Sequence, residues 1–252
     1  MRILIANDDG IYSPGIAALA AAATRFGDVR VVAPDVEKSS AGHSITASRP
    51  LSYRVTPLRD VPGVEAYRVD GTPADCVALG AYHWETVDVV LSGINLGPNL
   101  GNSMWHSGTL AAAKQAVLLG MRGIALSAPV TRGEPNFELL RPWVERVLEF
   151  LLPAQELQLV NVNFPDGEPR GLCWAHQSVR HYDGKVVPAE DPLGRRLFWF
   201  TVVPIEETEE HSDRWAIEHG YVSMTPLRLD LTDERALAAA RAQRPTDAPP
   251  HA

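Results

Sequence analysis

The stretch Ile-Leu-Ile-Ala-Asn-Asp-Asp-Gly occupies residues 3–10 and decides the fold class. Its first three residues form a short, continuous apolar run, which is typical of a strand buried on both faces of a parallel sheet. The run ends abruptly in Asn7, Asp8, Asp9 and Gly10. In open α/β sheets, ligands bind at the carboxyl ends of the strands. This stretch therefore predicts a buried first strand that ends in a polar site.

Asp8 and Asp9 are adjacent carboxylates, and each disfavours ionisation of the other unless a cation or several hydrogen-bond donors lie nearby. Oxygen ligands from Asp and Asn suit hard ions such as Mg²⁺ or Mn²⁺. The alternative is that the two acids cap the next helix or form a turn with Gly10. Residues 3–10 alone are compatible with both interpretations. Polar residues further along the chain distinguish between them.

Apolar runs of strand length alternate with helical patterns through the first two thirds of the chain. The strand-like runs are 3–5, 29–33, 87–91, 123–127 and 159–163, and the helical segments are 16–26, from 73 onward, 109–119 and 137–152. Residues 51–58 and 64–70 are predicted to be strands outside the main sheet. This alternation predicts an α/β fold with a Rossmann-like, doubly wound, mainly parallel sheet, because parallel strands need right-handed crossover helices.

The pattern changes after residue 171 to short alternating runs at 172–179, 197–203 and 221–225, followed by a helix over 232–244. We interpret 171–244 as a β-rich C-terminal extension that serves as a dimerising arm. It belongs to one domain, residues 1–244, whose core covers about 1–165. The last residues, 245–252, are rich in Pro and are predicted to form a disordered tail.

The composition is that of a globular protein, with 45% hydrophobic and 21% charged residues among 252. The formal charge of −8 argues against a nucleic-acid polymer as partner, because phosphate backbones require a basic surface. A small phosphorylated ligand stays compatible, since one metal ion changes the local sign of charge. No apolar run is long enough for a membrane span, and the start does not resemble a signal peptide. Cys76 and Cys173 fit no metal or redox spacing, so we expect a cytoplasmic protein with no membrane partner.

Three predicted strand ends carry acidic, hydroxyl or amide side chains, at residues 7–9, 39 and 92–95. Such ends lie at the same edge of a doubly wound sheet, so they are placed to converge on one ion. The candidate metal ligands are Asp8, Asp9, Ser39 and Asn95. Water would complete the octahedron that Mg²⁺ and Mn²⁺ prefer. Each of these four residues, taken alone, is as compatible with an ordinary loop position. The prediction of a metal site therefore depends on their joint placement at one edge of the sheet.

A candidate anion site follows in the glycine-rich loop 96–102 and at Ser107-Gly108-Thr109, where a helix begins. Free N–H groups and the helix dipole attract phosphate at such a position. We expect Ser107, Gly108 and Thr109, together with Asn99, to bind phosphate oxygens. The alternative is simple capping by Ser107 or Thr109. Neither a P-loop nor a Gly-x-Gly-x-x-Gly motif after the first strand is present, which disfavours dinucleotide binding.

His43 and His106 flank the two predicted site loops, and either is a candidate to protonate a leaving oxygen. Each is equally compatible with a structural role. We take His43 and Asp8 as the candidate catalytic residues, and leave open whether the nucleophile is Asp8 or a water activated by the ion. No Gly-x-Ser-x-Gly motif or readable Ser/His/Asp triad is present.

Five motifs occur in order along the chain. They are Ile-Leu-Ile-Ala-Asn-Asp-Asp-Gly (3–10), Ala-Pro-Asp (33–35) with Ser-Ser-Ala-Gly-His-Ser-Ile-Thr (39–46), Gly-Thr-Pro-Ala-Asp-Cys (71–76), Ser-Gly-Ile-Asn-Leu-Gly (92–97) and His-Ser-Gly-Thr (106–109). Together they resemble the signature blocks of the SurE family, the stationary-phase survival proteins, over roughly the first half of the chain. One departure is Ala6, where the family usually has threonine. Because it neighbours the candidate ligands, we expect it to tune the site.

The resemblance implies a metal-dependent phosphomonoesterase that hydrolyses nucleoside monophosphates, as a 5′-nucleotidase and also a 3′-nucleotidase, with short polyphosphate as a further substrate. It implies one divalent ion per subunit, Mg²⁺ or Mn²⁺, on the same four residues, Asp8, Asp9, Ser39 and Asn95. It also implies a Rossmann-like core whose C-terminal extension builds a homodimer or homotetramer.

Two other protein classes place acids after a first strand. A receiver-like regulatory module that binds Mg²⁺ is the alternative function, but it needs an Asp at the end of its third strand and a Lys after its fifth. Here the corresponding segments are Ser-Gly-Ile-Asn (92–95) and Ala-Pro (128–129). Haloacid-dehalogenase-type phosphatases use Asp-x-Asp, whereas Asp8 and Asp9 are adjacent.

Overall fold

The computed structural model describes residues 1–130, 133, 135–179, 183–203 and 208–242, so the predicted tail 245–252 lies outside the described residues. The strands are β1 (Arg2–Ala6), β2 (Asp28–Pro34), β3 (Tyr53–Val55), β4 (Glu65–Val69), β5 (Val89–Leu96), β6 (Arg122–Ala128), β7 (Leu159–Asn163), β8 (Leu172–Trp174), β9 (Asp183–Glu190), β10 (Arg196–Val203) and β11 (Val222–Pro226). The helices are α1 (Pro14–Ala23), α2 (Pro73–Trp84), the 3₁₀ helix η1 (Gly101–Trp105), α3 (Gly108–Leu118), α4 (Phe137–Leu151), α5 (Asp213–Glu218) and α6 (Glu234–Ala242).

Nine of these strands form one sheet in the order β3-β4-β2-β1-β5-β6-β7-β11-β8. β1 lies next to the central strand, β5, and pairs in parallel with β2 on one side and β5 on the other. The parallel pairing continues through β6 to β7, while β11 runs antiparallel to β7 and β3 antiparallel to β4. The predicted fold class, an α/β protein with a mainly parallel central sheet, is confirmed.

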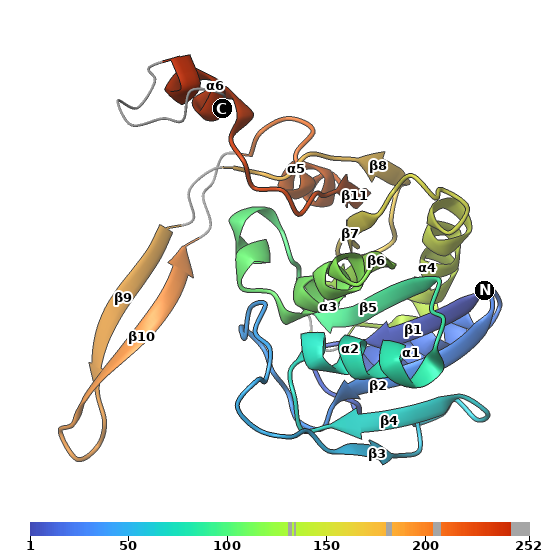
Figure 1. The fold of residues 1–252 in the computed structure, drawn as a ribbon. Helices are drawn as coiled ribbons and strands as arrows, with labels where there is room; N and C mark the ends of the chain where they lie inside the picture. Colours follow the sequence, from blue (N-terminus) through green and yellow to red (C-terminus); the bar gives the residue numbers. More distant parts are fainter. Residues whose placement is uncertain (131–132, 134, 180–182, 204–207, 243–252) are drawn as a thin grey trace, which may run out of the picture.

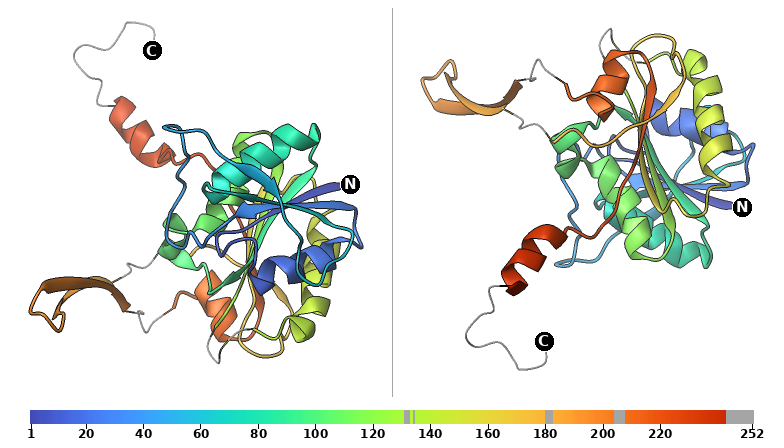
Figure 2. Two further views of the ribbon diagram at one scale, coloured as in Figure 1. Left: turned by 90° about the horizontal axis from the view of Figure 1, so that it is seen from below. Right: turned by 90° about the horizontal axis from the view of Figure 1, so that it is seen from above.

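Helices cover both faces of the sheet, as the ribbon shows (Figures 1 and 2). The alternation of side chains along β1 explains the two layers, because successive residues of a strand point to opposite faces. Ile3 and Ile5 belong to the core cluster that α1 and α4 close, whereas Leu4 and Ala6 belong to the cluster of α2 and α3. The continuous apolar run at the start of the sequence is therefore a strand buried on both faces.

The helices α2, α3 and α4 begin within one residue of the predicted positions, whereas α1 begins two residues earlier and α6 two residues later. Ser13 caps α1 and Pro14 opens it. At the start of α2, the Thr72 hydroxyl accepts a hydrogen bond from the Asp75 N–H at 3.1 Å, and the Asp75 carboxylate accepts one from the Thr72 N–H at 2.8 Å. These reciprocal bonds satisfy backbone donors that would otherwise lack partners at a helix start.

The edges of the sheet differ from the prediction. Residues 51–58 and 64–70 were predicted to form strands outside the main sheet, which is wrong, because β3 and β4 form one of its edges. β4 pairs in parallel with β2 and buries Ala66 and Val69, so this edge extends the core. At the opposite edge, β8 and β11 from the C-terminal segment complete the sheet.

The antiparallel hairpin of β9 and β10 pairs from Arg196 with Glu190 to Val203 with Asp183. It projects away from the sheet and the helices that cover it, and α6 projects from another side (Figures 1 and 2). The segments β9 and α5 were not individually predicted. None of the described helices combines the length and apolar character that crossing a membrane requires.

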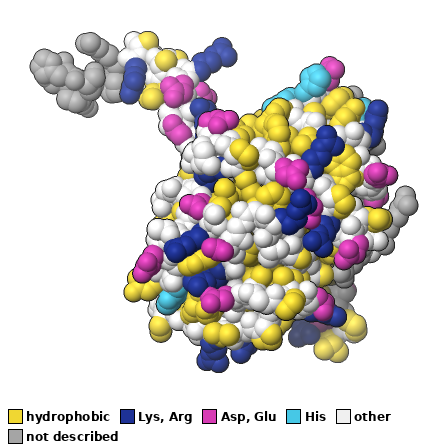
Figure 3. Space-filling model, turned by 90° about the vertical axis from the view of Figure 1, so that its right-hand side faces the viewer, with side chains coloured by type: hydrophobic (Ala, Val, Ile, Leu, Met, Phe, Trp, Pro, Cys, Tyr) yellow, Lys and Arg dark blue, Asp and Glu magenta, His cyan; other side chains and the backbone are white. Residues whose placement is uncertain are grey.

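Figure 3 shows the face that lies to the right in Figure 1, where side chains of both charge signs are interspersed with apolar ones. Protein surfaces that track a nucleic-acid backbone carry a continuous basic stripe instead. On this face, the described residues form no such stripe.

Candidate functional site

The acid pair lies where the ends of β1, β2 and β5 meet. The backbone N–H of Lys38, in the loop after β2, donates to the carbonyl oxygen of Asp8 at 2.7 Å. The N–H of Leu96, the last residue of β5, donates to Oδ2 of Asp9 at 3.1 Å. Ser39 and Asn95 are the immediate neighbours of these two donors, so the structure brings the loops of all four candidate metal ligands together.

Asp9 and Ser39 line one cavity of about 450 Å³, together with Tyr12, Asp35 and Glu37 among others. The Ser39 hydroxyl donates to Oε1 of Glu37 at 2.6 Å. Two acidic side chains besides Asp9 therefore line the cavity, and its charge favours a cation.

The turn after β1 is held by Asn7 and not by the acids. The buried Asn7 side chain accepts from the Gly10 N–H at 3.2 Å and donates to the Gly10 carbonyl at 3.0 Å and to the Ser13 hydroxyl at 2.9 Å. Gly10 has a φ of 93°, a conformation that glycine adopts without strain. Because Asn7 and Ser13 close the turn and cap α1, the carboxylates of Asp8 and Asp9 are left for another role.

Asp8 contacts the start of α3. The Thr109 hydroxyl donates to Oδ1 of Asp8 at 2.6 Å. A Cβ atom on Gly108 would lie 2.7 Å from Cβ and 2.8 Å from Oδ2 of Asp8, so only glycine allows this approach. The predicted phosphate-binding segment and the predicted metal-binding segment are therefore in direct contact.

Both carboxylates have raised pKa values. Burial raises the pKa of Asp8, against the opposing effect of hydrogen bonds from Thr109 and from the backbone of Gly108. Burial, followed by the charge of Asp8, raises the pKa of Asp9 to about 6. Among the described residues, no Lys, Arg or His forms an ion pair with either acid. A buried and a partly buried carboxylate, adjacent and without a counter-charge, make a site that a divalent ion would stabilise.

The other two candidate ligands supply neutral oxygens. Nδ2 of Asn95 donates to the Gly97 carbonyl at 2.6 Å, which orients the amide and leaves Oδ1 as its ligating atom. With the Ser39 hydroxyl, the donor set is entirely oxygen and fits Mg²⁺ or Mn²⁺. Within the described ranges, no group of three or more His, Cys, Asp or Glu side chains is placed to hold a metal. Any ion here therefore depends on the hydroxyl and amide oxygens.

Asn99 lies behind Thr109 in a buried polar network. Its Nδ2 donates to the Ser127 hydroxyl at 2.9 Å and to the Thr109 hydroxyl at 3.4 Å. Its own backbone is held on both sides by Asn163, which accepts from the Asn99 N–H at 2.7 Å and donates to the Asn99 carbonyl at 3.1 Å. Asn161 donates to the same carbonyl at 2.8 Å.

The role of Asn161 and Asn163 was not predicted from the sequence. A signal was present, because the two amides alternate with valine in the otherwise apolar strand 159–163. A polar residue at a buried strand position needs a hydrogen-bond partner. Here the partner is the backbone of the glycine-rich loop.

The remaining predicted residues lie at the start of α3 or beside it. Ser107 is buried and caps α3, since its hydroxyl accepts from the Leu110 N–H at 3.0 Å. His43 is exposed, and its Nε2 lies 2.9 Å from Oε1 of Gln115 on α3. The N–H of Gly42 donates to the carbonyl of His106 at 3.1 Å. The loop that carries Ser39 is thus attached to α3 and to the segment before it.

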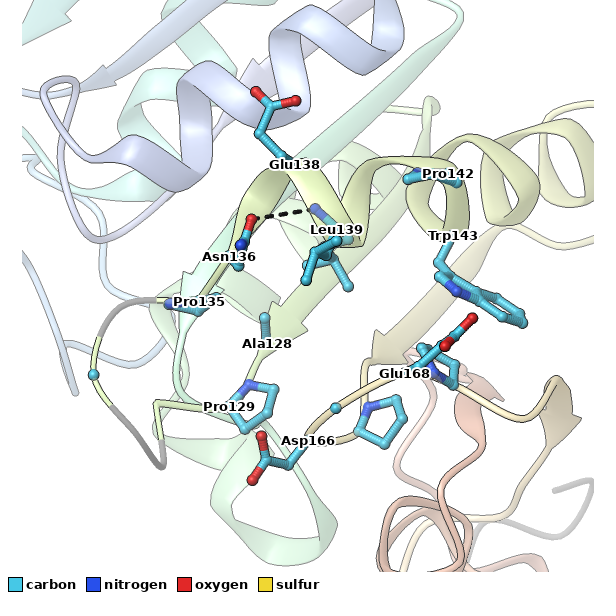
Figure 4. Close-up of a pocket in the computed structure, with 15 residues that line it drawn as sticks. Ala128, Pro129, Pro135, Asn136, Glu138, Leu139, Pro142, Trp143, Asp166 and Glu168 are labelled. Carbon is cyan, nitrogen blue, oxygen red and sulfur yellow. Dashed lines mark hydrogen bonds between the residues drawn. The ribbon is translucent and has the colours of Figure 1, made fainter.

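A second groove, of about 590 Å³, opens at the start of α4 (Figure 4). Leu139 and Trp143 from α4 line one side of it, and Pro129 and Asp166 lie across from them in the close-up. Its lining is mainly apolar, and none of the predicted site residues contributes to it. We therefore place the functional site at the smaller cavity, which Asp9 lines next to the buried Asp8.

Comparison with known proteins agrees with the motif resemblance. A family model described as survival protein SurE matches residues 3–184. The 5′-nucleotidase SurE 1 of Thermus thermophilus is 45% identical over 236 residues, covering 92% of this chain and 93% of that protein. The 5′-nucleotidase SurE of Deinococcus radiodurans is 43% identical over 238 residues, covering 92% and 88%.

The fold is shared as well. The crystal structure of the SurE protein from Aquifex aeolicus superposes with a TM-score of 0.82 at 38% sequence identity. The superposition covers 96% of this chain and 99% of that one, so the C-terminal segment is included. The family model, the two relatives and this structure lead to one conclusion: the chain belongs to the SurE family.

Proposed function

We propose that this protein is a metal-dependent 5′-nucleotidase that hydrolyses nucleoside monophosphates to nucleoside and phosphate. The observation that carries the proposal is the adjacent pair of buried Asp8 and partly buried Asp9, which lacks a cationic partner among the described residues and contacts the start of α3 through Asp8. Its relatives are named 5′-nucleotidase SurE, and this is the activity that we assign to the chain.

We propose that one divalent ion per subunit, Mg²⁺ or Mn²⁺, binds to Asp8, Asp9, Ser39 and Asn95. Such an ion offsets the charge of a phosphoryl group and orients the ester for in-line attack. The two carboxylates supply the negative charge that holds the ion, and the hydroxyl and the amide supply neutral oxygens. Four protein ligands leave coordination positions open for the substrate.

The start of α3 is our proposed site for the remaining phosphate oxygens, through Ser107, Gly108 and Thr109. The helix dipole favours an anion there, and backbone N–H groups of Gly108 and Thr109 already donate to the Asp8 carboxylate. The amide of Asn99 is already bonded to the hydroxyls of Thr109 and Ser127. We therefore propose that Asn99 supports phosphate binding by orienting Thr109.

We propose that His43 protonates the leaving oxygen, since imidazole is the side chain that most often acts as a general acid in enzymes. Its contact with Gln115 would hold the ring beside α3. We propose that the same metal and phosphate sites also accept 3′ esters and the terminal phosphate of short polyphosphates, because these sites would contact the phosphoryl group alone.

We also propose that the C-terminal extension assembles the protein into a homodimer or homotetramer. The support is the projecting hairpin, on which Phe198 and Trp199 are 66% and 65% exposed. Large exposed apolar groups of this kind mark association surfaces. With Cys76 and Cys173 both free, we place the protein in the reducing cytoplasm.

The experiment that tests the proposed activity compares the wild type with Asp8→Asn on nucleoside monophosphates, with Mg²⁺, Mn²⁺ or EDTA. We expect turnover by the wild type with metal, and loss of turnover with EDTA or in the variant, whose circular dichroism should match the wild type. Turnover near the wild-type rate by Asp8→Asn would contradict the proposal.

A further inference from the structure

A tryptophan lies in the chain just before the start of α3, the segment proposed to bind phosphate. Trp105 is the last residue of η1, two positions before the residue that caps α3, and is 53% exposed. Large apolar side chains are usually buried, and an exposed indole beside a polar site is a candidate for ligand contact. No role for this residue follows from the proposed metal and phosphate sites.

The indole of Trp105 is held from one side by Lys114. Nζ of Lys114, on α3, lies over the ring at 5.4 Å from its centroid. Lys114 is half-buried, and among the described residues it forms no ion pair that would draw it away from the ring. Such a cation–π contact restrains the ring, because the ammonium prefers the negative face of the indole. No ring or cation contact from the described side chains covers the opposite face.

Trp105 also lies where the two site loops meet. The next residue, His106, accepts through its carbonyl a hydrogen bond from Gly42, in the loop that carries Ser39. Gly108, three residues after Trp105, contacts Asp8. Three peptide units span at most about 11 Å, so the Cα of Trp105 lies within that distance of the segment proposed to bind phosphate.

We propose that the face of Trp105 opposite Lys114 is the stacking platform for the nucleobase of the substrate, with Lys114 anchoring the ring from the other side. The proposal rests on the proposed nucleotidase function and adds the part of the site that recognises the nucleoside. Stacking accepts every base, because each has a π-face. A platform of this kind makes the enzyme tolerant of base identity while it discriminates against phosphate esters without a base.

The test compares Trp105→Ala and Trp105→Phe with the wild type on adenosine 5′-monophosphate and on ribose 5-phosphate. We expect Trp105→Ala to raise KM for the nucleotide by about 5- to 150-fold, the ratio that matches the loss of one base–aromatic stack, with kcat little changed. The KM for ribose 5-phosphate should stay the same, which also shows that the variant is folded. Phenylalanine should restore most of the affinity for the nucleotide.

A matched control is Trp174→Ala, which removes a tryptophan of similar exposure, 45%, from β8 at the edge of the sheet. It should leave both KM values unchanged. Adenosine alone should quench the fluorescence of the wild type more than that of Trp105→Phe, which tests the platform without turnover.

Two outcomes would overturn the platform. One is an equal effect of Trp105→Ala on both substrates, or no effect on either. The other is base discrimination that is lost in Tyr12→Ala and kept in Trp105→Ala, which would place the base beside Asp9 on the α1 side of the cavity. A wild type that hydrolyses no nucleotide would instead contradict the proposed function.

Discussion

The hydroxyl of Thr109 donates a 2.6 Å hydrogen bond to Oδ1 of Asp8, although the two residues are 101 positions apart in the sequence. Both residues are buried, and Asn99 donates to the same hydroxyl from the other side. A hydroxyl that donates to a carboxylate while it accepts from an amide has its orientation fixed. The first turn of α3 thereby sets the position of the Asp8 carboxylate.

The first prediction replaces this hydroxyl. Thr109→Val keeps the shape of the side chain but leaves Oδ1 of Asp8 without this donor, and we expect it to lower the free energy of unfolding by about 1–3 kcal/mol. Mn²⁺ should also bind more weakly, because the carboxylate is no longer held. Thr109→Ser keeps the hydroxyl and serves as the control. Urea unfolding measures the change in stability, and Mn²⁺ titration measures the change in affinity. A Thr109→Val variant with the same stability and Mn²⁺ affinity as Thr109→Ser would contradict the account.

The second prediction uses the close approach of Gly108 to Asp8. In Gly108→Ala, the new Cβ would lie 2.7 Å from the Asp8 Cβ, which forces the carboxylate to move. We expect Mn²⁺ affinity to fall about 10- to 100-fold, as when other groups that orient a metal ligand are changed. Gly171→Ala is the control, because its nearest atom would be a Tyr221 carbon at 3.7 Å. If Gly108→Ala and Gly171→Ala bind Mn²⁺ with equal affinity in isothermal titration, this result would count against the placement of Asp8 in the metal site.

The third prediction concerns pH. Burial, followed by the charge of Asp8, raises the pKa of Asp9 to about 6 in the metal-free protein, while an unfolded Asp titrates near about 3.9. The folded state therefore binds a proton more tightly than the unfolded state between these values. The resulting stability is present below pH 4 and is lost as pH rises through 6.

We therefore expect Asp9→Asn to be more stable than the wild type at pH 7 in EDTA, and this difference to shrink as pH falls toward 4. Urea unfolding across this range, with both proteins in EDTA, measures the difference directly. A difference that does not change with pH would show that Asp9 has an ordinary pKa.

The fourth prediction concerns the hairpin of β9 and β10. Phe198→Ser combined with Trp199→Ser removes one large apolar group from each face of β10. We expect the wild type to be a dimer or tetramer and the double variant to have a smaller mass by light scattering. Equal masses would show that the hairpin is not the association surface.

Much of the architecture could be predicted from the sequence, because buried parallel strands and capped helices have local signatures. The run Leu-Val-Asn-Val-Asn at 159–163 is β7 without a shift at either end. The capping pattern of Thr72, Pro73 and Asp75 marks the start of α2. The sheet edges could not be predicted this way, because the pairing of β4 with β2 depends on contacts between residues over 30 positions apart.

The candidate site was predicted in part. The strand-end argument selected Asp8, Asp9, Ser39 and Asn95, and the structure brings their loops together. Whether they bind a metal stays a prediction. The contacts of Thr109 with Asp8 and of Asn163 with Asn99 could not be predicted, because they join segments more than 60 positions apart through one and two hydrogen bonds, respectively.

The measurement that tests the central claim most directly is the anomalous difference density of a crystal soaked in Mn²⁺. The account predicts one strong peak per subunit, within ligand distance of Asp8 and Asp9 and bordered by Ser39 and Asn95. The peak should be absent from an Asp8→Asn crystal soaked in the same way. A peak elsewhere, or no peak between the two carboxylates of the wild type, would contradict the account.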